Sequence, residues 1–346
     1  MMTRELTLIT DYRQAFYSRH SNRRTFCSMS LNALEASFRS MGVSICRTMF
    51  RDIDLSETWA GRVVIYQSSE DPNLDYRSFI EDMALGLKLA GAVLIPDFHF
   101  LRAHHNKVFF ENLRKTSRCR AINNLRSRVF GTLEECDMDE LDYPLVIKPA
   151  AGAASRDVCL ATARHCASRH IKRISRSHDG VFSAKEGFKR LLLREYTPYS
   201  LHRRKFVCQQ FIPGLHCDYK VLVFGRRYYV LQRDVRPNDF RASGSGRFVW
   251  PSSDSSGILT YARTIVEAFD VPFASLDIAV GTDEKYLLEG QFLCFGTLTV
   301  EAAPHHWTYS ETMGFEKVLG TPSPEEALAE AVTDHCERHG LWPNGH

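Results

Sequence analysis

Two different patterns of apolar segments follow one another along this chain of 346 residues, and their order constrains the fold more than any other feature. Between residues 30 and 100, strand-like and helix-like runs alternate, which is typical of a parallel sheet. The expected elements are a helix capped by Ser30, strands at 43–46, 63–66 and 93–96, and a helix with Phe79, Met83, Leu87 and Ala90 on one face. The sequence therefore predicts a small α/β domain in this part of the chain.

Farther along, strand-like runs are separated by turns. Residues 145–155 contain a buried strand that enters a loop of small residues, and 205–214 a strand that ends at a Pro-Gly turn. The runs 218–233 and 275–292 are each predicted to form a hairpin, the first turning at Gly225. Helices are expected at 258–269 and from Ser323 onward. This pattern predicts antiparallel sheets, so the chain as a whole combines α/β with α+β structure.

Composition and charge exclude several classes of protein. With 44% apolar and 25% charged residues, the chain is typical of a soluble globular protein. The formal net charge of +3 is too small for a strongly basic surface, so we expect no nucleic-acid partner. Because no stretch approaches about twenty apolar residues, neither a membrane span nor a signal peptide is expected, and we predict a cytoplasmic protein. The 10 cysteines lack CxxC spacing and are predicted to be reduced thiols.

Acidic residues occur in both apolar runs of the second hairpin. Asp277 lies near the end of the first run and Glu289 at the end of the second, so their side chains could converge from facing strands. Gln291 points to the same face of the sheet as Glu289, because alternate residues of a strand share a face. Carboxylate and amide oxygens suit Mg2+, which also binds substrate phosphates. The alternative is a hairpin whose polar residues simply face solvent.

A lysine also stands at the end of an apolar run. Lys148 precedes a loop of alanine, glycine and serine, and a cation next to unobstructed backbone N–H groups suits phosphate oxygens. Arginines and small residues gather again at 233–248, where guanidinium groups suit phosphoryl oxygens. Each pattern has a simpler interpretation, namely a lysine at a strand end and a solvated surface turn.

Taken in order, these residues resemble the ATP-grasp superfamily of carboxylate–amine ligases. The residues that carry the resemblance are Lys107, Lys148, Gln210-Phe211-Ile212, Asp218, Lys220, Arg241, Asp277 and Glu289-Gly290-Gln291. The likeness extends from about residue 60 to about residue 300. It implies a small parallel-sheet pre-ATP-grasp domain followed by a two-lobed ATP-grasp fold with antiparallel sheets. The implied boundaries are 1–103 for an N-terminal extension and the pre-ATP-grasp domain, 104–213 for a small lid subdomain, and 214–346 for a C-terminal subdomain with the metal site.

The resemblance implies ATP and Mg2+ as cofactors. The implied nucleotide-binding residues are Lys107 and Lys148 at the phosphates, Gln209, Gln210, Phe211 and Ile212 at the adenine, Asp218 at the ribose, and Lys220 and Ser243. Arg233 and Arg241 would act on the transferring phosphoryl group and the acyl phosphate, and Asp277, Glu289 and Gln291 would bind the metal. Lys107 could also be an ordinary exposed helix lysine, and Asp218 a turn residue.

The implied reaction forms an amide or peptide bond from a small carboxylate, such as an amino acid or peptide, and an amine, through an acyl phosphate. ADP and phosphate are the expected products. Two other functions stay open: a kinase of related fold that phosphorylates a small-molecule hydroxyl, and a non-catalytic nucleotide-binding protein. Fold likeness alone does not decide among them.

The sequence departs from the family pattern in two places. Gln291 stands where the family usually has Asn in its Glu-x-Asn motif, which puts the number of metal ions in doubt. The loop after Lys148 contains only Gly152, where the family usually has more glycines. The basic segment 164–180 is expected to be a solvated face, or else a cover for an acidic substrate.

Overall fold

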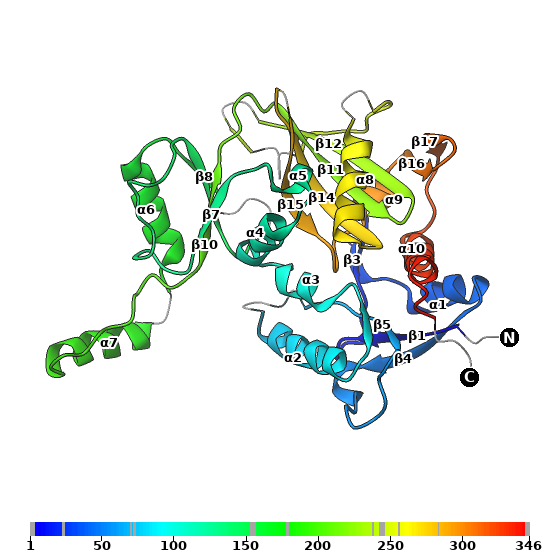
Figure 1. The fold of residues 1–346 in the computed structure, drawn as a ribbon, viewed down its shortest axis with the longest axis horizontal. Coiled ribbons are helices and arrows are strands. Elements are labelled where there is room, and N and C mark those ends of the chain that lie inside the picture. Colours follow the sequence, from blue (N-terminus) through cyan, green and yellow to red (C-terminus); the bar gives the residue numbers. More distant parts are fainter. Residues whose placement is uncertain are drawn as a thin grey trace.

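The computed structural model describes residues 4–342 apart from 23–24, 70, 72–73, 153–156, 178–179, 237–238, 242–245, 255–256 and 283, and it gives no side-chain placement for 18–22 and 25–27. The described residues form a four-stranded parallel sheet, a four-stranded antiparallel sheet and a seven-stranded antiparallel sheet, together with a two-stranded ribbon. The three larger sheets occupy different parts of the molecule (Figure 1). The predicted combination of α/β and α+β structure is therefore confirmed.

The parallel sheet has the strand order β4-β1-β5-β6. Its central strand β1 (Arg4–Thr10) pairs with β4 (Val43–Met49) and β5 (Val63–Ile65), and β6 (Val93–Ile95) is at the edge. The three strands predicted between residues 30 and 100 are confirmed, but β1 was not predicted from the sequence. Its apolar residues form only a short run among frequent charges, although all but its first two residues are buried.

Helices cover both faces of this sheet. Helix α1 (Leu31–Ser40) packs on one face, and the Oγ of Ser30 accepts a hydrogen bond from Ala33 N, as predicted. Helix α2 (Asp75–Leu89) packs on the other face. The predicted apolar face of α2 was partly wrong, because Phe79 is exposed and the buried positions are Arg77, Ile80, Ala84 and Leu87. The error arose because Arg77 lies on the buried face, where its guanidinium is satisfied by Glu81 and Leu101 O.

Short elements connect the parallel sheet to the rest of the molecule. They are β2 (Ser18–Asn22), β3 (Thr25–Ser28), the 3-10 helix η1 (Phe50–Asp52), α3 (Phe98–Ala103), α4 (Lys107–Thr116) and α5 (Arg120–Asn123). Phe110 of α4 and Ile122 of α5 belong to the apolar core beneath the seven-stranded sheet. The domain boundary at residues 103 and 104 stays a prediction.

The small antiparallel sheet has the order β7-β10-β8-β9. Its strands are β7 (Ser127–Phe130), β8 (Leu145–Pro149), β9 (Cys159–Ala161) and β10 (Phe206–Gln210). Helix α6 (Arg164–Ser175) packs on this sheet through Ala167, Ile171 and Ile174. The basic segment is therefore only partly a solvated face, because one side of α6 is core.

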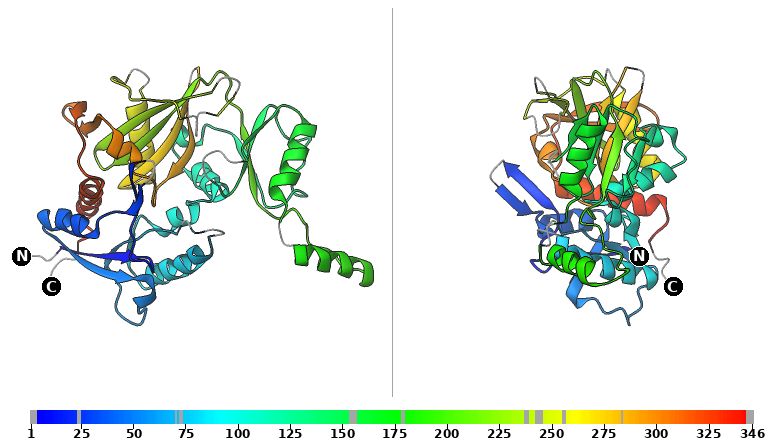
Figure 2. Two further views of the ribbon diagram at one scale, coloured as in Figure 1. Left: turned by 180° about the vertical axis from the view of Figure 1, so that it is seen from behind. Right: turned by 90° about the vertical axis from the view of Figure 1, so that its left-hand side faces the viewer.

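Helix α7 (Gly180–Leu192) was not expected from the sequence. It projects away from the body of the molecule (Figures 1 and 2). Phe188, Leu191 and Leu192 on this helix are all exposed.

The seven-stranded sheet has the order β15-β14-β11-β12-β16-β17, with β13 paired to β12. Its strands are β11 (Cys217–Phe224), β12 (Arg227–Asp234), β13 (Phe248–Val249), β14 (Phe273–Val280), β15 (Lys285–Gln291), β16 (His305–Ser310) and β17 (Gly314–Leu319). Both predicted hairpins are confirmed by the β11–β12 and β14–β15 pairings. The helices are α8 (Ile258–Phe269), α9 (Leu298–Ala302) and α10 (Pro324–Arg338), of which α8 and α10 are predicted correctly.

Two expectations from composition can be compared with the structure. Within the described part of the chain, none of the helices is long and apolar enough to cross a membrane. The nine cysteines whose side chains are described are free thiols, as expected.

Candidate active site

A cavity of about 320 Å³ lies between the small antiparallel sheet and the seven-stranded sheet. Strands β8 and β10 line it from one side, and β11, β12, β14 and β15 from the other. Every site residue predicted from the sequence lines this cavity except Ser243, which lies outside the described residues. The predicted residues that line it are Lys107, Lys148, Gln209, Gln210, Phe211, Ile212, Asp218, Lys220, Arg233, Arg241, Asp277, Glu289 and Gln291.

The pairing of β14 with β15 explains why the acidic side chains meet. Asp277 lies directly opposite Glu289, and Ser275 lies opposite Gln291, so all four side chains share one face of the sheet. Lys220 on β11 lies opposite Asp277 on its other side. The carboxylates stand in the middle of their strands, whereas the apolar runs had suggested strand ends. Alternation along several paired strands therefore produces a row of polar groups on the cavity face.

The residue between Glu289 and Gln291 must be small. A side chain at Gly290 would point to the opposite face of the sheet, where a Cβ atom would come within 2.7 Å of Phe292 and 3.1 Å of Phe110. Real Cβ atoms do not approach other atoms so closely, so a larger residue would push the aromatic core or the strand aside. Glycine at this position therefore lets β15 pack closely on Phe292 and Phe110 while its two polar neighbours face the cavity.

An arginine fixes the acidic residues in place. Arg233 donates from Nε to Asp218 Oδ1 at 2.6 Å and from Nη2 to Asp218 Oδ2 at 2.8 Å, and its Nη2 lies 3.0 Å from Asp277 Oδ2. Burial acts to lower the pKa of Arg233, but Asp277 and Asp218 outweigh it and raise that pKa. Arg233 thus donates its hydrogen bonds to carboxylates of the protein. Asp218 is bound by Arg233 and is not a turn residue.

Asp277 keeps unused capacity to bind a ligand. Among the described residues its Oδ1 has no hydrogen-bond partner, and the nearest cation, Lys220 Nζ, is 3.8 Å away. Burial would raise the pKa of Asp277, but the charges of Arg233 and Lys220 outweigh burial and hold that pKa below its usual value. The group is therefore an ionised carboxylate with one oxygen available to a cation.

Two lysines face these carboxylates. Lys107, the first residue of α4, places Nζ 3.1 Å from Glu289 Oε1 and 2.8 Å from Gly152 O, so it is not an ordinary exposed helix lysine. Lys148 is half-buried on β8, and burial lowers its pKa while the carboxylates of Glu289 and Glu111 partly offset that effect. Both lysines line the cavity.

The residues predicted to contact adenine lie at the end of β10. The side-chain amide of Gln209 donates to Glu111 Oε1 at 3.1 Å, and Gln209 is buried. The main-chain N–H of Gln210 donates to Arg126 O at 2.9 Å. Phe211 and Ile212 follow the strand and line the cavity. The side-chain amide of Gln209 and the main-chain N–H of Gln210 are therefore already engaged within the protein. Phe211 and Ile212 are better placed than these two residues to contact an adenine ring.

Arg241 reaches the cavity from the segment after β12. Asp239 holds its guanidinium with two hydrogen bonds of 3.0 Å, from Nε to Oδ1 and from Nη2 to Oδ2. Side-chain hydrogen bonding to Asp239 raises the pKa of Arg241. Arg241 therefore contributes a fixed positive charge at the cavity.

The lining of the cavity is rich in positive charge. Among the residues that the structure describes, five basic side chains and three acidic ones line it. The basic residues are Lys107, Lys148, Lys220, Arg233 and Arg241, and the acidic ones are Asp218, Asp277 and Glu289. Such a lining suits an anion that carries several charges and arrives with a divalent cation.

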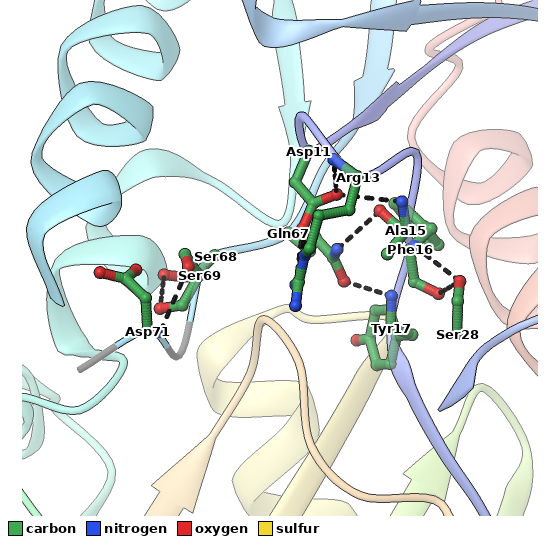
Figure 3. Close-up of polar contacts among 10 residues, drawn as sticks. All are labelled: Asp11, Arg13, Ala15, Phe16, Tyr17, Ser28, Gln67, Ser68, Ser69 and Asp71. Carbon is green, nitrogen blue, oxygen red and sulfur yellow. Dashed lines mark hydrogen bonds and ion pairs between the residues drawn. The ribbon is translucent and has the colours of Figure 1, made fainter. Parts of the chain in front are cut away.

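A polar cluster near this site was missed from the sequence (Figure 3). It follows the carboxyl ends of β1 and β5, where buried Asp11 accepts a hydrogen bond of 2.8 Å from Arg13 Nε and buried Gln67 accepts one from Tyr17 N. The hydroxyl of Tyr17 donates to Leu293 O, two residues beyond Gln291. The cluster was missed because β1 was not recognised as a strand.

Comparisons with known proteins agree with this architecture. No protein-family model matches the sequence, and no curated protein matches it at a significant level. Among solved structures, the D-cycloserine synthetase DcsG is 14% identical, with 95% of this chain and 99% of that chain covered and a TM-score of 0.51. The ATP-grasp ligase PsnB, complexed with a minimal precursor, is 14% identical, with 97% and 100% covered and a TM-score of 0.52. Similarity over nearly the whole length of both chains shows a shared fold, and the chain has the ATP-grasp fold.

Proposed function

We propose that the chain is an ATP-dependent carboxylate–amine ligase that forms an amide or peptide bond and releases ADP and phosphate. One observation carries the proposal: Lys107 and Lys148 face Asp277, Glu289 and Gln291 across a single cavity. Lysine ammonium groups suit phosphate oxygens, and a set of carboxylate and amide oxygens suits Mg2+. Solved structures of the similar PsnB contain AMPPNP in one case and Mg with ADP in another.

The donor set fits a hard cation. Asp277 Oδ1 is buried and without a hydrogen bond among the described residues, and Glu289 lies opposite it with Gln291 on the same face. Asp277, Glu289 and Gln291 would hold Mg2+, which would supply positive charge at the β- and γ-phosphates of ATP. Lys107 now lies 3.1 Å from Glu289 and would transfer its contact to a phosphate oxygen. Arg233 acts by positioning Asp218 and Asp277.

The chemistry has two steps. A substrate carboxylate oxygen attacks the γ-phosphorus, and the bond from that phosphorus to the bridging oxygen breaks, which releases ADP and leaves an acyl phosphate. An amine then attacks the acyl carbon, the bond from this carbon to the phosphate oxygen breaks, and phosphate departs with the electron pair. The amine proton passes to phosphate or water. Arg241 lies at the cavity, where its charge would stabilise the oxyanion and the departing phosphate.

The acceptor substrates would bind beside the nucleotide. The polar cluster of Asp11, Arg13 and Gln67 contacts the chain just beyond Gln291 through Tyr17. Asp11 is 1% exposed and its oxygens already accept from Arg13 and Ala15, but the side chain of Arg13 is 58% exposed, so its guanidinium offers a partner for the carboxyl group of an amino acid or peptide. We therefore propose amino acids or peptides as the substrate class.

Trapping of the intermediate tests the proposal. Acids from a panel of amino acids and peptides are incubated with the enzyme, ATP, Mg2+ and hydroxylamine, and hydroxamate is measured with iron(III). We expect hydroxamate and ADP in equal amounts, because hydroxylamine attacks the activated carbonyl in place of the amine. Glu289→Gln should lower both by about 10²- to 10³-fold, the scale of one lost electrostatic contact to the transition state. Glu284→Gln is the matched control, because Glu284 belongs to the same hairpin, its side chain is 42% exposed and it does not line the cavity.

Three other outcomes would each overturn the proposal. AMP and pyrophosphate would show an adenylating enzyme. ADP with a stable phosphoester and no hydroxamate would show a kinase. Nucleotide binding without turnover across acid and amine pairs would show a non-catalytic nucleotide-binding protein.

A further inference from the structure

A second group of candidate metal ligands lies away from the cavity. His335 and His339 are four residues apart on and just after α10, so they share one side of the helix. Asp270, which caps the end of α8, completes the group. One ligand atom from each of the three residues lies within 4.8 Å of the others. None of the three lines the cavity described above.

The contacts within this group point toward a bound cation. His339 Nε2 is 2.9 Å from Asp270 Oδ1, and the rings of His335 and His339 have centroids 4.5 Å apart. His335 is only 8% exposed, and within the described part of the chain its Nδ1 has no hydrogen-bond partner. A buried nitrogen without a partner is costly unless something binds to it.

Solvent access and local geometry are suitable as well. The side chains of Asp270 and His339 are 58% and 36% exposed, so a cation could enter from solvent and keep a water ligand. Arg338 is a basic residue near His335, and the negative charge of Asp270 offsets its positive charge.

We propose that Asp270, His335 and His339 form a binding site for a divalent transition metal of the zinc type, which ties α10 to the turn between α8 and β14. Two imidazole nitrogens and one carboxylate oxygen are ligands that Zn2+ prefers, with Zn–N distances of about 2.0–2.1 Å and water in the fourth position. Two exposed side chains can adjust around the buried His335. The site is structural: it joins a helix that packs on the N-terminal domain to the strand that carries Asp277.

Zinc titration of the purified, chelator-treated full chain tests the site. Excess Mg2+ is present throughout, so that the oxygen-rich cavity is occupied by the hard cation. We expect one Zn2+ per chain by calorimetry and a higher thermal midpoint with zinc. Asp270→Asn and His339→Gln should each weaken binding by about 100-fold or more, since even partners outside the ligand shell contribute about 10- to 100-fold.

The two variants are chosen to fold. Asp270 has φ +50°, a conformation that asparagine tolerates, and His339 is partly exposed, so neither change disturbs the core. His165→Gln, an exposed histidine beside Cys166, is the control and should bind zinc like the wild type. Co2+ provides a second readout, because its visible absorption should appear in the wild type and disappear in both variants. The proposal is wrong if the wild type binds no zinc, or if Asp270→Asn and His339→Gln bind it as tightly as the wild type.

Discussion

Two buried pairs of arginine and carboxylate in this molecule are built from the same groups but differ in one respect. On α4, Arg114 is 0% exposed and donates to Glu111 Oε2 at 2.6 Å, to Ile122 O at 3.1 Å and to Leu125 O. In the cavity, Arg233 holds Asp218 and Asp277, but Asp277 Oδ1 has no hydrogen bond among the described residues. In the first pair, which we call the saturated pair, both carboxylate oxygens of Glu111 accept hydrogen bonds from the protein. In the second, Asp277 Oδ1 can still accept a ligand.

The difference separates structural charges from charges that can bind a ligand. A buried ion pair whose hydrogen bonds are all made gains nothing from an outside group, whereas a buried oxygen without a partner gains from a cation. Glu111 accepts hydrogen bonds from Arg114, Ser127 and Gln209, and it anchors α4 to β7 and β10. The pair at Glu111 should therefore control folding, and the groups around Asp277 should control binding.

The largest expected effect tests the saturated pair. Arg114→Met should lower the free energy of unfolding by about 3–5 kcal/mol, because it leaves Glu111 as a buried charge without its main partner. Urea denaturation followed by circular dichroism measures this change. The double variant Arg114→Met with Glu111→Gln should recover part of the loss, since the unpaired charge is then gone. A loss below about 1 kcal/mol for Arg114→Met would show that the two pairs do not differ as described.

The next effect concerns affinity at the cavity. Lys148→Met should weaken ATP binding by about 1.5–3 kcal/mol, the value of a hydrogen bond to a charged group. The thermal midpoint of the Lys148→Met variant should stay unchanged or rise. The folded state holds the pKa of Lys148 below its unfolded value, so keeping the ammonium charged at neutral pH costs stability, and methionine removes this cost. Calorimetric titration with ATP and Mg2+ measures the affinity.

Lys205→Met provides the matched control for this prediction. Lys205 is an exposed lysine just before β10 and does not line the cavity. ATP affinity should be unchanged in this variant. Equal losses of affinity in the two variants would mean that ATP responds to overall charge, and Lys148 would then have no specific part in binding.

The cavity was more predictable from the sequence than the saturated pair, for a physical reason. Alternation along a strand is visible in the sequence, and antiparallel pairing brings Asp277 to Glu289 without further information. The contact between Gln209 and Glu111 joins residues 98 positions apart and depends on how α4 packs against β10. No local pattern reports such packing. Likewise the spacing of His335 and His339 is visible, but the approach of Asp270 is not.

Short elements were the other source of error. Strand β1 was missed because Leu6, Leu8 and Ile9 form only a brief apolar run, and its central place in the sheet comes from pairing with β4 and β5. The buried face of α2 was shifted because Arg77 occupies it, with hydrogen bonds that only the tertiary structure provides. In both cases tertiary contacts outweighed the local pattern.

The smallest expected effect concerns Gln209, which belongs to both regions. It lines the cavity, yet its side-chain amide donates to Glu111 Oε1 at 3.1 Å, so its side chain belongs with the saturated pair of Arg114 and Glu111. Gln209→Met should lower the free energy of unfolding by about 1–3 kcal/mol, because Glu111 loses a hydrogen-bond donor. ATP affinity, measured by calorimetry, should stay within about twofold, since the cavity groups that face phosphate and metal are untouched. The opposite result, weaker ATP binding at unchanged stability, would place Gln209 with the nucleotide and remove the boundary between the two regions.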